Sequence, residues 1–387
     1  MSLSQKLVQN LQGDRVIWTI VLLFAALSVI AVCSSTNLLA YREKGGDTEF
    51  YLLKHGFFIA GGLLITYLCS LLPYQVFARM ARILMIITIP LLLYTLFFGV
   101  DVNHARRWIT IPIISLTFQA SDLAKLALVV YLARELARRQ DQIKDFQSAF
   151  LPILIPVILV CGLIAPANLS TALMLFATSI LLMIVGRVKM THVLGLVGAG
   201  LLLFGVLFLV GMAFPELTRS GTWISRIQDF LYDTDGGYQL QQSKIAIAKG
   251  GFFGEGPGNS IQRNFLPSPY ADFIYAIIIE EYGLFGGTFL LGLYVILFIR
   301  SVRLVTLCEG AFGALLTMGM SLLIVLQALA NMAVSVHLVP VTGLTLPLIS
   351  MGGTSLLFFS MSAGMILSVS RQVERQRIQS SSEPIAA

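Results

Sequence analysis

The stretches without a charged side chain limit this chain more than any other feature. Residues 311–370 contain no Asp, Glu, Lys or Arg, and residues 149–186 contain none either. A bilayer core about 30 Å thick needs roughly 20 apolar residues per helix, so each run can hold two membrane spans. Only 12% of the 387 residues are charged, about half of the roughly 25% found in soluble domains. The composition excludes a soluble, disordered or coiled-coil chain and, despite a net charge of +6, a nucleic-acid-binding protein.

The apolar runs predict an all-α polytopic membrane protein with ten transmembrane helices. The predicted spans are residues 16–33, 56–72, 83–100 and 120–133, two spans within 149–186, then 190–214, 272–299 and two spans within 311–370. Residues 340–353 (PVTGLTLPLISMGG) divide the last run and predict a re-entrant-like segment between helices 9 and 10. Irregular backbone at membrane depth is tolerated only against protein or a water-filled cavity, so this segment indicates a cavity.

The distribution of basic residues predicts the orientation of the bundle. Outside the longest loop, fifteen Lys and Arg residues lie on the N-terminal side of the predicted bundle and five on the other side. By the positive-inside rule, the N- and C-termini are therefore cytoplasmic. We expect residues 1–371 to form one transmembrane domain with a 57-residue extracytoplasmic loop, 215–271, between helices 7 and 8. Residues 372–387 should form a disordered cytoplasmic tail.

Charged residues inside the predicted spans are candidates for function, because each costs about 2.5–3.5 kcal/mol at a helix centre. Asp122 and Lys125 lie three residues apart on one helical face. This spacing fits either a self-neutralising ion pair or a cation that lines a polar cavity and binds an anion. Glu280 and Glu281 lie in the eighth span and fit either interhelical hydrogen bonding or a proton or cation pathway.

Asp272 differs because it stands at the junction of the long outer loop and the eighth span. Pro267 and Pro269 stiffen the approach to it. A carboxylate there is either a helix N-cap or a group that faces the outer aqueous side. Residues 250–260 form a glycine-rich run, which is either a turn or a backbone that approaches phosphate. The cysteines and histidines form no CxxC pair or Cys/His cluster, which disfavours a disulfide framework or a zinc site.

Taken together, these segments resemble the SEDS family of bacterial peptidoglycan glycosyltransferases (FtsW, RodA and SpoVE), and the chain is more similar to the division-associated FtsW branch. The resemblance spans nearly the whole chain and rests on residues 105–109 (ARRWI), 118–125 (FQASDLAK), 166–172 (PANLSTA), 238–243 (YQLQQS), 258–260 (GNS), 266–274 (LPSPYADFI), 280–283 (EEYG) and 340–355 (PVTGLTLPLISMGGTS). The chain departs from the family pattern at Ala120, Asp122 and Asn168, where Pro, Glu and Asp are usual.

This resemblance implies polymerisation of lipid II into β-1,4 glycan strands on the outer face of the bacterial cytoplasmic membrane, for cell division or cell shape. It makes Asp272 the catalytic residue, which we interpret as the general base, with undecaprenyl diphosphate as the leaving group. The candidate substrate-binding residues are Arg107, Asp122, Lys125, Gln242, Ser243, Lys244 and Arg263. The candidate structural polar residues within the membrane are Glu280, Glu281 and Asn331.

The implied partners are the lipid II substrate, a class B penicillin-binding protein with transpeptidase activity, and other divisome or elongasome membrane proteins. The pattern requires no cofactor, although a divalent cation (Mg²⁺ or Mn²⁺) is an alternative source of positive charge for the leaving diphosphate. Two other functions fit a bundle with a polar cavity, namely a lipid II flippase and a non-catalytic scaffold that recruits the transpeptidase. The outward clustering of the candidate residues and the lack of an internal repeat disfavour the flippase.

Overall fold

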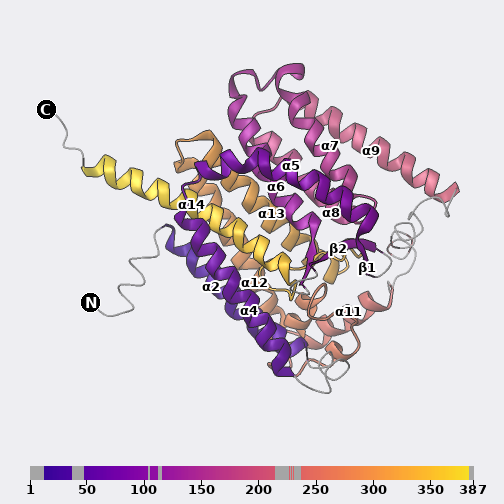
Figure 1. The fold of residues 1–387 in the computed structure, drawn as a ribbon. Coiled ribbons are helices and arrows are strands. Elements are labelled where there is room, and N and C mark those ends of the chain that lie inside the picture. Colours follow the sequence, from indigo (N-terminus) through magenta and orange to yellow (C-terminus); the bar gives the residue numbers. More distant parts are fainter. Residues whose placement is uncertain are drawn as a thin grey trace.

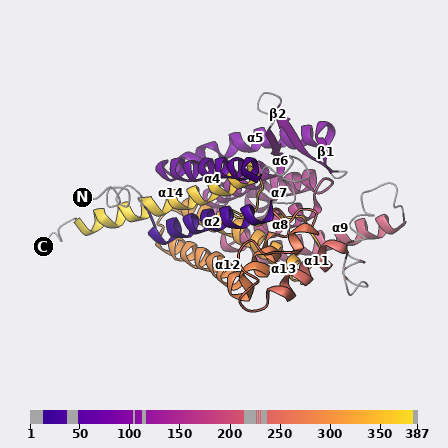
Figure 2. The same ribbon diagram turned by 90° about the horizontal axis from the view of Figure 1, so that it is seen from below.

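The computed structural model describes residues 13–36, 48–102, 105–111, 116–213, 226, 228, 230 and 237–382. These residues form a bundle of long helices with a small sheet at one end (Figures 1 and 2). A helix lies at each segment where the sequence predicts a span. These helices are α2 (Arg15–Ser35), α4 (Thr48–Leu71), α5 (Gln75–Phe98), α6 (Ala120–Arg138), α7 (Leu151–Ile164), α8 (Leu169–Val185), α9 (Met190–Ala213), α12 (Ile274–Leu307), α13 (Ala311–Ser335) and α14 (Thr354–Ser382).

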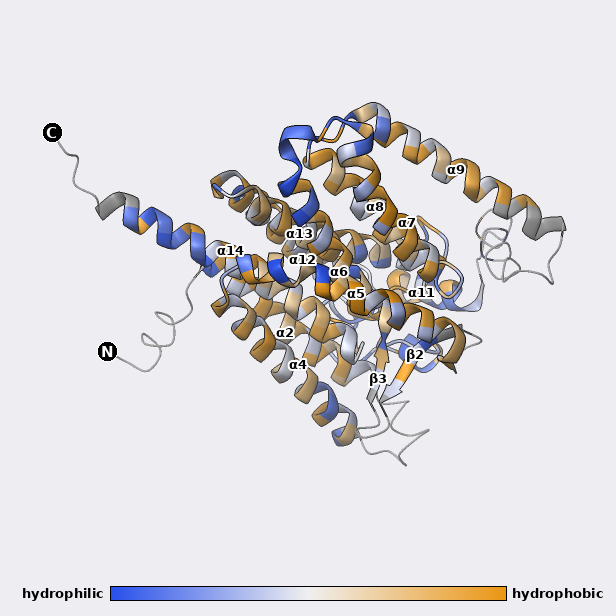
Figure 3. Ribbon diagram, turned by 45° about the horizontal axis from the view of Figure 1, so that its top comes forward, coloured by the Kyte–Doolittle hydropathy of each residue, from blue (hydrophilic) through white to orange (hydrophobic). Residues whose placement is uncertain are grey.

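Apolar residues cover most of these helices (Figure 3). In the described part of the chain, seven helices are long and apolar enough to cross a membrane, and the apolar stretches of α8 and α9 are shorter. The prediction of a multi-pass helical membrane protein is therefore confirmed in its coarse form. Helix α5 starts eight residues before the predicted span, at Gln75, so Arg79 and Arg82 belong to the helix rather than to a loop. A prediction from the length of apolar runs leaves out such charged helix ends.

Helix α13 lies in the middle of the bundle (Figure 1) and packs against α6, α8, α12 and α14. Its core side chains, such as Leu316, Met320 and Ile324, are completely or almost completely buried. The same helix also buries polar side chains, among them Gln327 and Asn331. Since a buried polar group is costly unless it is hydrogen-bonded, these residues point to polar partners on neighbouring segments.

The expectation of an all-α fold is wrong in one place. Between α5 and α6 the chain forms a three-stranded antiparallel sheet of β1 (Val100–Val102), β2 (Ala105–Ile111) and β3 (Leu116–Gln119). Its strands contain β-branched residues such as Ile109, Thr110 and Thr117, which favour extended backbone. Trp108 pairs with Gln119, so the sheet ends directly at the start of α6. It lies at the end of the bundle opposite the C-terminal part of α14 (Figure 2).

The start of α2 and the end of α14 lie on the same side of the bundle. The backbone N–H of Gly13 donates to Glu374 Oε2 over 2.9 Å, and that of Asp14 donates to Ser370 Oγ over 2.6 Å. Arg300 of α12 pairs with the Asp14 carboxylate at 2.8 Å. Helix α14 continues to Ser382, so residues 372–382 are helical where the sequence predicts a disordered tail. Residues 383–387 of that tail lie outside the described residues.

The predicted outer loop is described in part. It contains helix α11 (Tyr238–Gly250) and a short 3-10 turn, η3 (Gln262–Asn264). Helix α11 packs against α12 and α13, as expected for a loop that covers the membrane helices. Of residues 214–236, the structure describes only Arg226, Gln228 and Phe230.

Candidate functional site

A polar cavity of about 870 Å³ lies between α6, α13, β2 and the two irregular segments around Asp272 and Gly343. Four of the predicted site residues line it, namely Arg107, Asp122, Lys125 and Asp272. They come from separate parts of the chain and meet only in the folded bundle. This volume lies within the range of about 300–1,000 Å³ that is typical of sites for drug-sized ligands.

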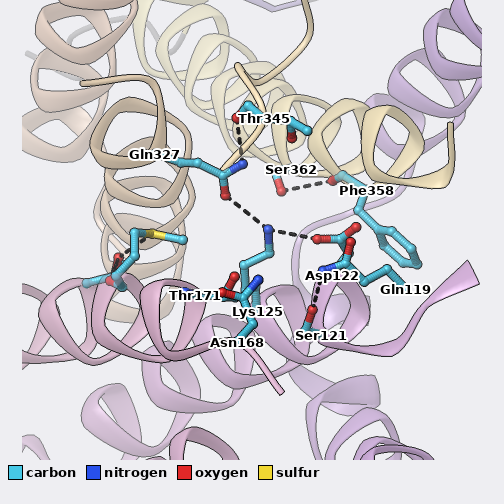
Figure 4. Close-up of polar contacts among 12 residues, drawn as sticks. Gln119, Ser121, Asp122, Lys125, Asn168, Thr171, Gln327, Thr345, Phe358 and Ser362 are labelled. Atoms are coloured by element: carbon cyan, nitrogen blue, oxygen red, sulfur yellow. Dashed lines mark hydrogen bonds and ion pairs between the residues drawn. The ribbon is translucent and has the colours of Figure 1, made fainter. Parts of the chain in front are cut away.

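Lys125 sits at the centre of a hydrogen-bonded group in the cavity wall (Figure 4). Its Nζ lies 2.8 Å from Asp122 Oδ1 and donates to Gln327 Oε1 over 3.0 Å. Gln327 in turn donates to the backbone oxygen of Thr345 over 2.9 Å, and the Phe359 ring lies 4.9 Å from the ammonium. The sequence left open an ion pair or a cavity-lining cation, and the structure has both.

The Asp122 carboxylate is not saturated by this pair. Its second oxygen, Oδ2, is buried and has no hydrogen-bond partner among the described residues. A buried carboxylate oxygen without a donor is unfavourable, so Asp122, which lines the cavity, keeps hydrogen-bonding capacity that the described residues do not use.

Asp272 lies two residues before α12, at the C-terminal end of the stiff segment that contains Pro267 and Pro269. The N-cap of α12 is Phe273, and no side chain caps the helix, so Asp272 does not have the N-cap role. The carboxylate lines the cavity and is half-buried. Opposite it stands Gly343 in left-handed backbone (φ +66°), where an added Cβ would lie 3.6 Å from Asp272 Oδ2. Since 3.6 Å is an ordinary contact distance, the left-handed backbone rather than a lack of space favours glycine at this position.

Two arginines face the same cavity as Asp272. Arg107 of β2 donates from Nε to the Ala167 carbonyl over 2.7 Å, and Arg226 donates from Nη1 to the Val341 carbonyl over 3.1 Å. Burial raises the pKa of the Asp272 carboxyl above its ordinary value, while the charges of Arg107 and Arg226 oppose this by lowering it. The cavity thus combines a carboxylate that accepts a proton more readily than an exposed aspartate with nearby fixed positive charges.

The other predicted substrate-binding residues lie away from the cavity lining. Ser243 of α11 is buried and donates to the Ser335 carbonyl over 2.8 Å, which fastens α11 to α13. Its neighbours Gln242 and Lys244 are half-buried on the same helix. Arg263 donates to the Ser34 carbonyl over 3.0 Å at the end of α2. A role for these four residues in substrate binding stays a prediction.

Glu280 and Glu281 form a second group of buried charges, which we call the loop anchor together with Ser34 and residues 260–263. Glu280 accepts hydrogen bonds from the Ser260 hydroxyl and from the backbone N–H groups of Ile261 (3.0 Å) and Gln262 (3.3 Å). Glu281 accepts a hydrogen bond from the Ser34 hydroxyl of α2. Glu281 therefore makes an interhelical hydrogen bond, whereas Glu280 holds the loop that leads to Asp272.

The glycine-rich run packs against the same helix. Gly283 breaks α12 with left-handed backbone (φ +68°), and an added Cβ there would lie 2.3 Å from the Phe252 carbonyl oxygen. Gly254 likewise leaves no room for a Cβ, which would lie 2.2 Å from the Glu281 carbonyl oxygen. The run crosses α12 at the break, where the backbone N–H of Glu255 donates to the Glu280 carbonyl over 2.9 Å. Close backbone packing therefore accounts for Gly254 and Gly283.

Sequence reasoning missed several cavity residues. Gln327, Thr345 and Gln239 are uncharged, so a search for charges within spans passes over them, although a glutamine inside a 60-residue charge-free run is itself a signal. Arg226 and Lys54 lie in loop or helix-end positions where basic residues are common. Among the described residues, no group of three or more His, Cys, Asp or Glu side chains could hold a metal ion.

The fold and the cavity define a multi-pass membrane protein with a buried, charged pocket at one end of its bundle. Residues 14–375 match the family described as "Cell cycle protein", the FtsW/RodA/SpoVE family, and the chain belongs to this family. A relative called "Probable peptidoglycan glycosyltransferase FtsW" from Geobacter sp. (strain M18) is 33% identical over 93% of this chain and 97% of its own length. "Stage V sporulation protein E" from Bacillus subtilis is 32% identical over 92% and 97%, respectively.

Solved structures share the fold. One, described as "Structural coordination of polymerization and crosslinking by a peptidoglycan synthase complex", is 26% identical, covers 93% of this chain and 98% of its own, and has a TM-score of 0.73. The "Rod shape determining protein RodA" of Thermus thermophilus has a TM-score of 0.67 at 24% identity, over 93% of this chain and 97% of its own, and supports the fold alone. The resemblance to the SEDS family is confirmed.

Proposed function

We propose that the chain is a peptidoglycan glycosyltransferase that polymerises lipid II, with Asp272 as general base. One observation carries the proposal. The Asp272 carboxylate shares a cavity with the positive charges of Arg107, Lys125 and Arg226. Glycosyl transfer from a diphosphate-linked donor needs a base for the attacking hydroxyl and positive charge for the departing diphosphate, and the names of the relatives fit this reaction.

In the proposed step, a hydroxyl of the acceptor sugar attacks the anomeric carbon of the donor sugar. Asp272 takes the hydroxyl proton as the new C–O bond forms. The bond between the anomeric carbon and the diphosphate breaks, and undecaprenyl diphosphate leaves with the electron pair. In-line attack inverts the α configuration of the donor, which gives the β-1,4 linkage. A single carboxylate suffices, because the diphosphate leaves as an anion and needs no proton from an acid.

We propose that positive charge is supplied mainly by the protein. Lys125 is held by Asp122 and Gln327, while Arg107 and Arg226 lie close enough to lower the pKa of Asp272. A divalent cation, if one takes part, would have Asp272 and Asp122 as the acidic groups of the cavity lining and would draw its other oxygen ligands from diphosphate and water.

The proposed topology has ten spans, cytoplasmic termini and a cavity that opens toward the outer face. The ten helices at the predicted positions and the contact between Gly13 and Glu374 support an even number of spans. The excess of basic residues on the side of those two residues supports a cytoplasmic location. We further propose that the chain works beside a class B penicillin-binding protein, since a structure that shares its fold is described as part of a peptidoglycan synthase complex. The FtsW-type relatives favour a role in division.

The test is the Asp272→Asn variant, purified with the partner transpeptidase and given lipid II. Asparagine keeps the shape but cannot take the proton, so glycan synthesis should fall roughly 10²–10⁴-fold. Asp145→Asn makes the same change in the exposed loop between α6 and α7 and should leave synthesis unchanged. Undiminished glycan chains from Asp272→Asn would exclude the proposed base, and lipid II transfer across liposomes without polymerisation would favour the flippase.

A further inference from the structure

The backbone that carries Asp272 is held at three successive residues. The Tyr270 carbonyl accepts a hydrogen bond from the backbone N–H of Met351 over 2.9 Å, and the Ala271 carbonyl accepts one from Ser350 Oγ over 2.6 Å. The Asp272 carbonyl accepts one from Asn331 Nδ2 over 2.7 Å. All three donors come from outside the loop that contains Asp272.

Two side chains among these donors are themselves fixed. Ser350 Oγ accepts a hydrogen bond from the Leu346 N–H over 2.8 Å while it donates to Ala271. Asn331 Nδ2 donates to the Leu344 carbonyl over 2.6 Å as well as to Asp272. Asn331 is 1% exposed and Ser350 is 3% exposed. The irregular segment 340–353 and the Asp272 segment are therefore joined into one unit.

The far side of this unit is also anchored. Ser28 of α2 donates to the Ile349 carbonyl over 2.6 Å, and its hydroxyl lies 2.8 Å from His55 Nε2 of α4. The unit therefore connects α13 on one side with α2 and α4 on the other. A displacement of segment 340–353 would be transmitted directly to Asp272.

Stability alone does not account for an asparagine at position 331. It lies in a long helix without a charged residue, where a buried amide is costly unless its hydrogen-bonding groups are satisfied. Its Nδ2 makes two hydrogen bonds, but Oδ1 is buried and has no partner in the part of the chain that the structure describes. A residue selected only for packing would be apolar here. The amide is used for its donors, and one of these binds the carbonyl of Asp272 itself.

We propose that Asn331 and Ser350 are positioning residues that hold the Asp272 carboxylate in the cavity at the place where it takes the acceptor proton. This inference rests on the proposed function of Asp272. Catalysis by a positioned base is sensitive to geometry, and a shift of about 1 Å can cost roughly 100-fold in rate. The two side chains act through the backbone of Asp272 and do not themselves touch the reacting atoms.

The experiment compares Asn331→Leu, Ser350→Ala and Ser350→Thr, each purified with the partner and assayed on lipid II. Leucine keeps the branched arrangement of four side-chain heavy atoms of asparagine but has no donor, and threonine keeps the hydroxyl that alanine removes. We expect kcat to fall roughly 10- to 100-fold for Asn331→Leu with KM unchanged, and Ser350→Thr to retain more activity than Ser350→Ala. Once released, Asp272 should move toward water, so the acid limb of the kcat profile should shift to lower pH.

The matched control is Ser335→Ala, one turn after Asn331 on α13. Ser335 is also fully buried and donates within the helix, to the Asn331 carbonyl over 3.1 Å, but makes no contact with Asp272. It should leave kcat and the acid limb unchanged. If Asn331→Leu does not fold, the two Ser350 variants make the comparison alone. Wild-type kcat and an unmoved acid limb in folded variants would overturn the proposal.

Asp272→Asn, assayed in parallel, distinguishes the positioning role of Asn331 and Ser350 from the general-base role of Asp272. If Asp272→Asn is inactive while the folded Asn331 and Ser350 variants behave as wild type, positioning is wrong and the general base stands. If Asp272→Asn retains activity, the general base itself is wrong, and positioning fails with it.

Discussion

Helices α6 and α12 each carry buried charges close together in sequence, but the two groups bind different partners. In α6, Lys125 pairs with Asp122, and both line the cavity. One oxygen of Asp122 has no partner among the described residues. In α12, both oxygens of Glu280 accept hydrogen bonds from the loop after Ser260, and neither Glu280 nor Glu281 lines the cavity.

The contrast between α6 and α12 bears on how a charge inside a membrane span is interpreted. Both groups fit the rule that such charges mark functional sites. In the loop anchor, however, both oxygens of Glu280 accept hydrogen bonds from hydroxyl and backbone N–H donors of the protein, so this carboxylate holds the chain in place. In the cavity pair, Asp122 Oδ2 is buried without a partner among the described residues, and both side chains line the cavity. Burial and charge alone do not distinguish the two roles, whereas unused hydrogen-bonding capacity beside a cavity does.

The largest effect should come from removing one member of the cavity pair. Lys125→Ala leaves Asp122 as a buried carboxylate without its cation, which should destabilise the protein by about 3–5 kcal/mol. It also removes a positive charge from the proposed diphosphate site, so glycan synthesis should be lost. Thermal unfolding in detergent and polymerisation of lipid II measure the two effects separately.

The double variant Asp122→Ala/Lys125→Ala is the control. Without the unpaired carboxylate, most of the stability should return, while synthesis should remain lost because the cavity still lacks the cation. If the double variant recovers both stability and synthesis, Lys125 serves only as half of an internal ion pair.

A smaller effect, on stability rather than on catalysis, is expected in the loop anchor. Glu280→Gln replaces a charged acceptor with an amide that turns an N–H₂ group toward the donors Ser260, Ile261 and Gln262. The free energy of unfolding should fall by about 1–3 kcal/mol. The kcat per folded molecule should stay unchanged, because the carboxylate lies outside the cavity lining.

This variant also decides between the two interpretations of Glu280 left open by the sequence. Unfolding temperature and single-turnover rate are measured on the same preparation. A folded, stable Glu280→Gln variant with a reduced rate would contradict a purely structural anchor and favour a proton or cation pathway through α12.

The helices could be predicted from the sequence because each depends on a local property, the length of an apolar run. The candidate pair Asp122 and Lys125 could be predicted for the same reason, since a spacing of three places both on one helical face. The role of Asp272 came from the resemblance to a family rather than from spacing, which also fitted an N-cap. Its actual surroundings, Gly343 above all, belong to a segment about 70 residues away.

The remaining features could not be predicted because they depend on contacts between distant segments. The β1–β3 sheet forms in a stretch too short and too mixed to stand out beside long apolar helices. The glycine-rich run at 250–258 fits a phosphate loop by sequence, and only the folded chain reveals that Gly254 packs against the break in α12 at Gly283. Gln327 and Ser350 are polar residues in a charge-free run, and only the folded chain reveals that one binds Lys125 and the other the Ala271 carbonyl.

The pH dependence of kcat also distinguishes the cavity from the loop anchor. As a base, Asp272 acts when deprotonated, so kcat should fall about tenfold per pH unit below its pKa. Because burial raises that pKa, the acid limb should lie above the value of about 3.9 of an ordinary aspartate. Arg107 lowers the pKa, so Arg107→Gln should move the limb to higher pH, whereas Glu280→Gln should leave it in place. A limb that moves with Glu280→Gln and not with Arg107→Gln would assign the titrating carboxylate to the loop anchor instead of the cavity.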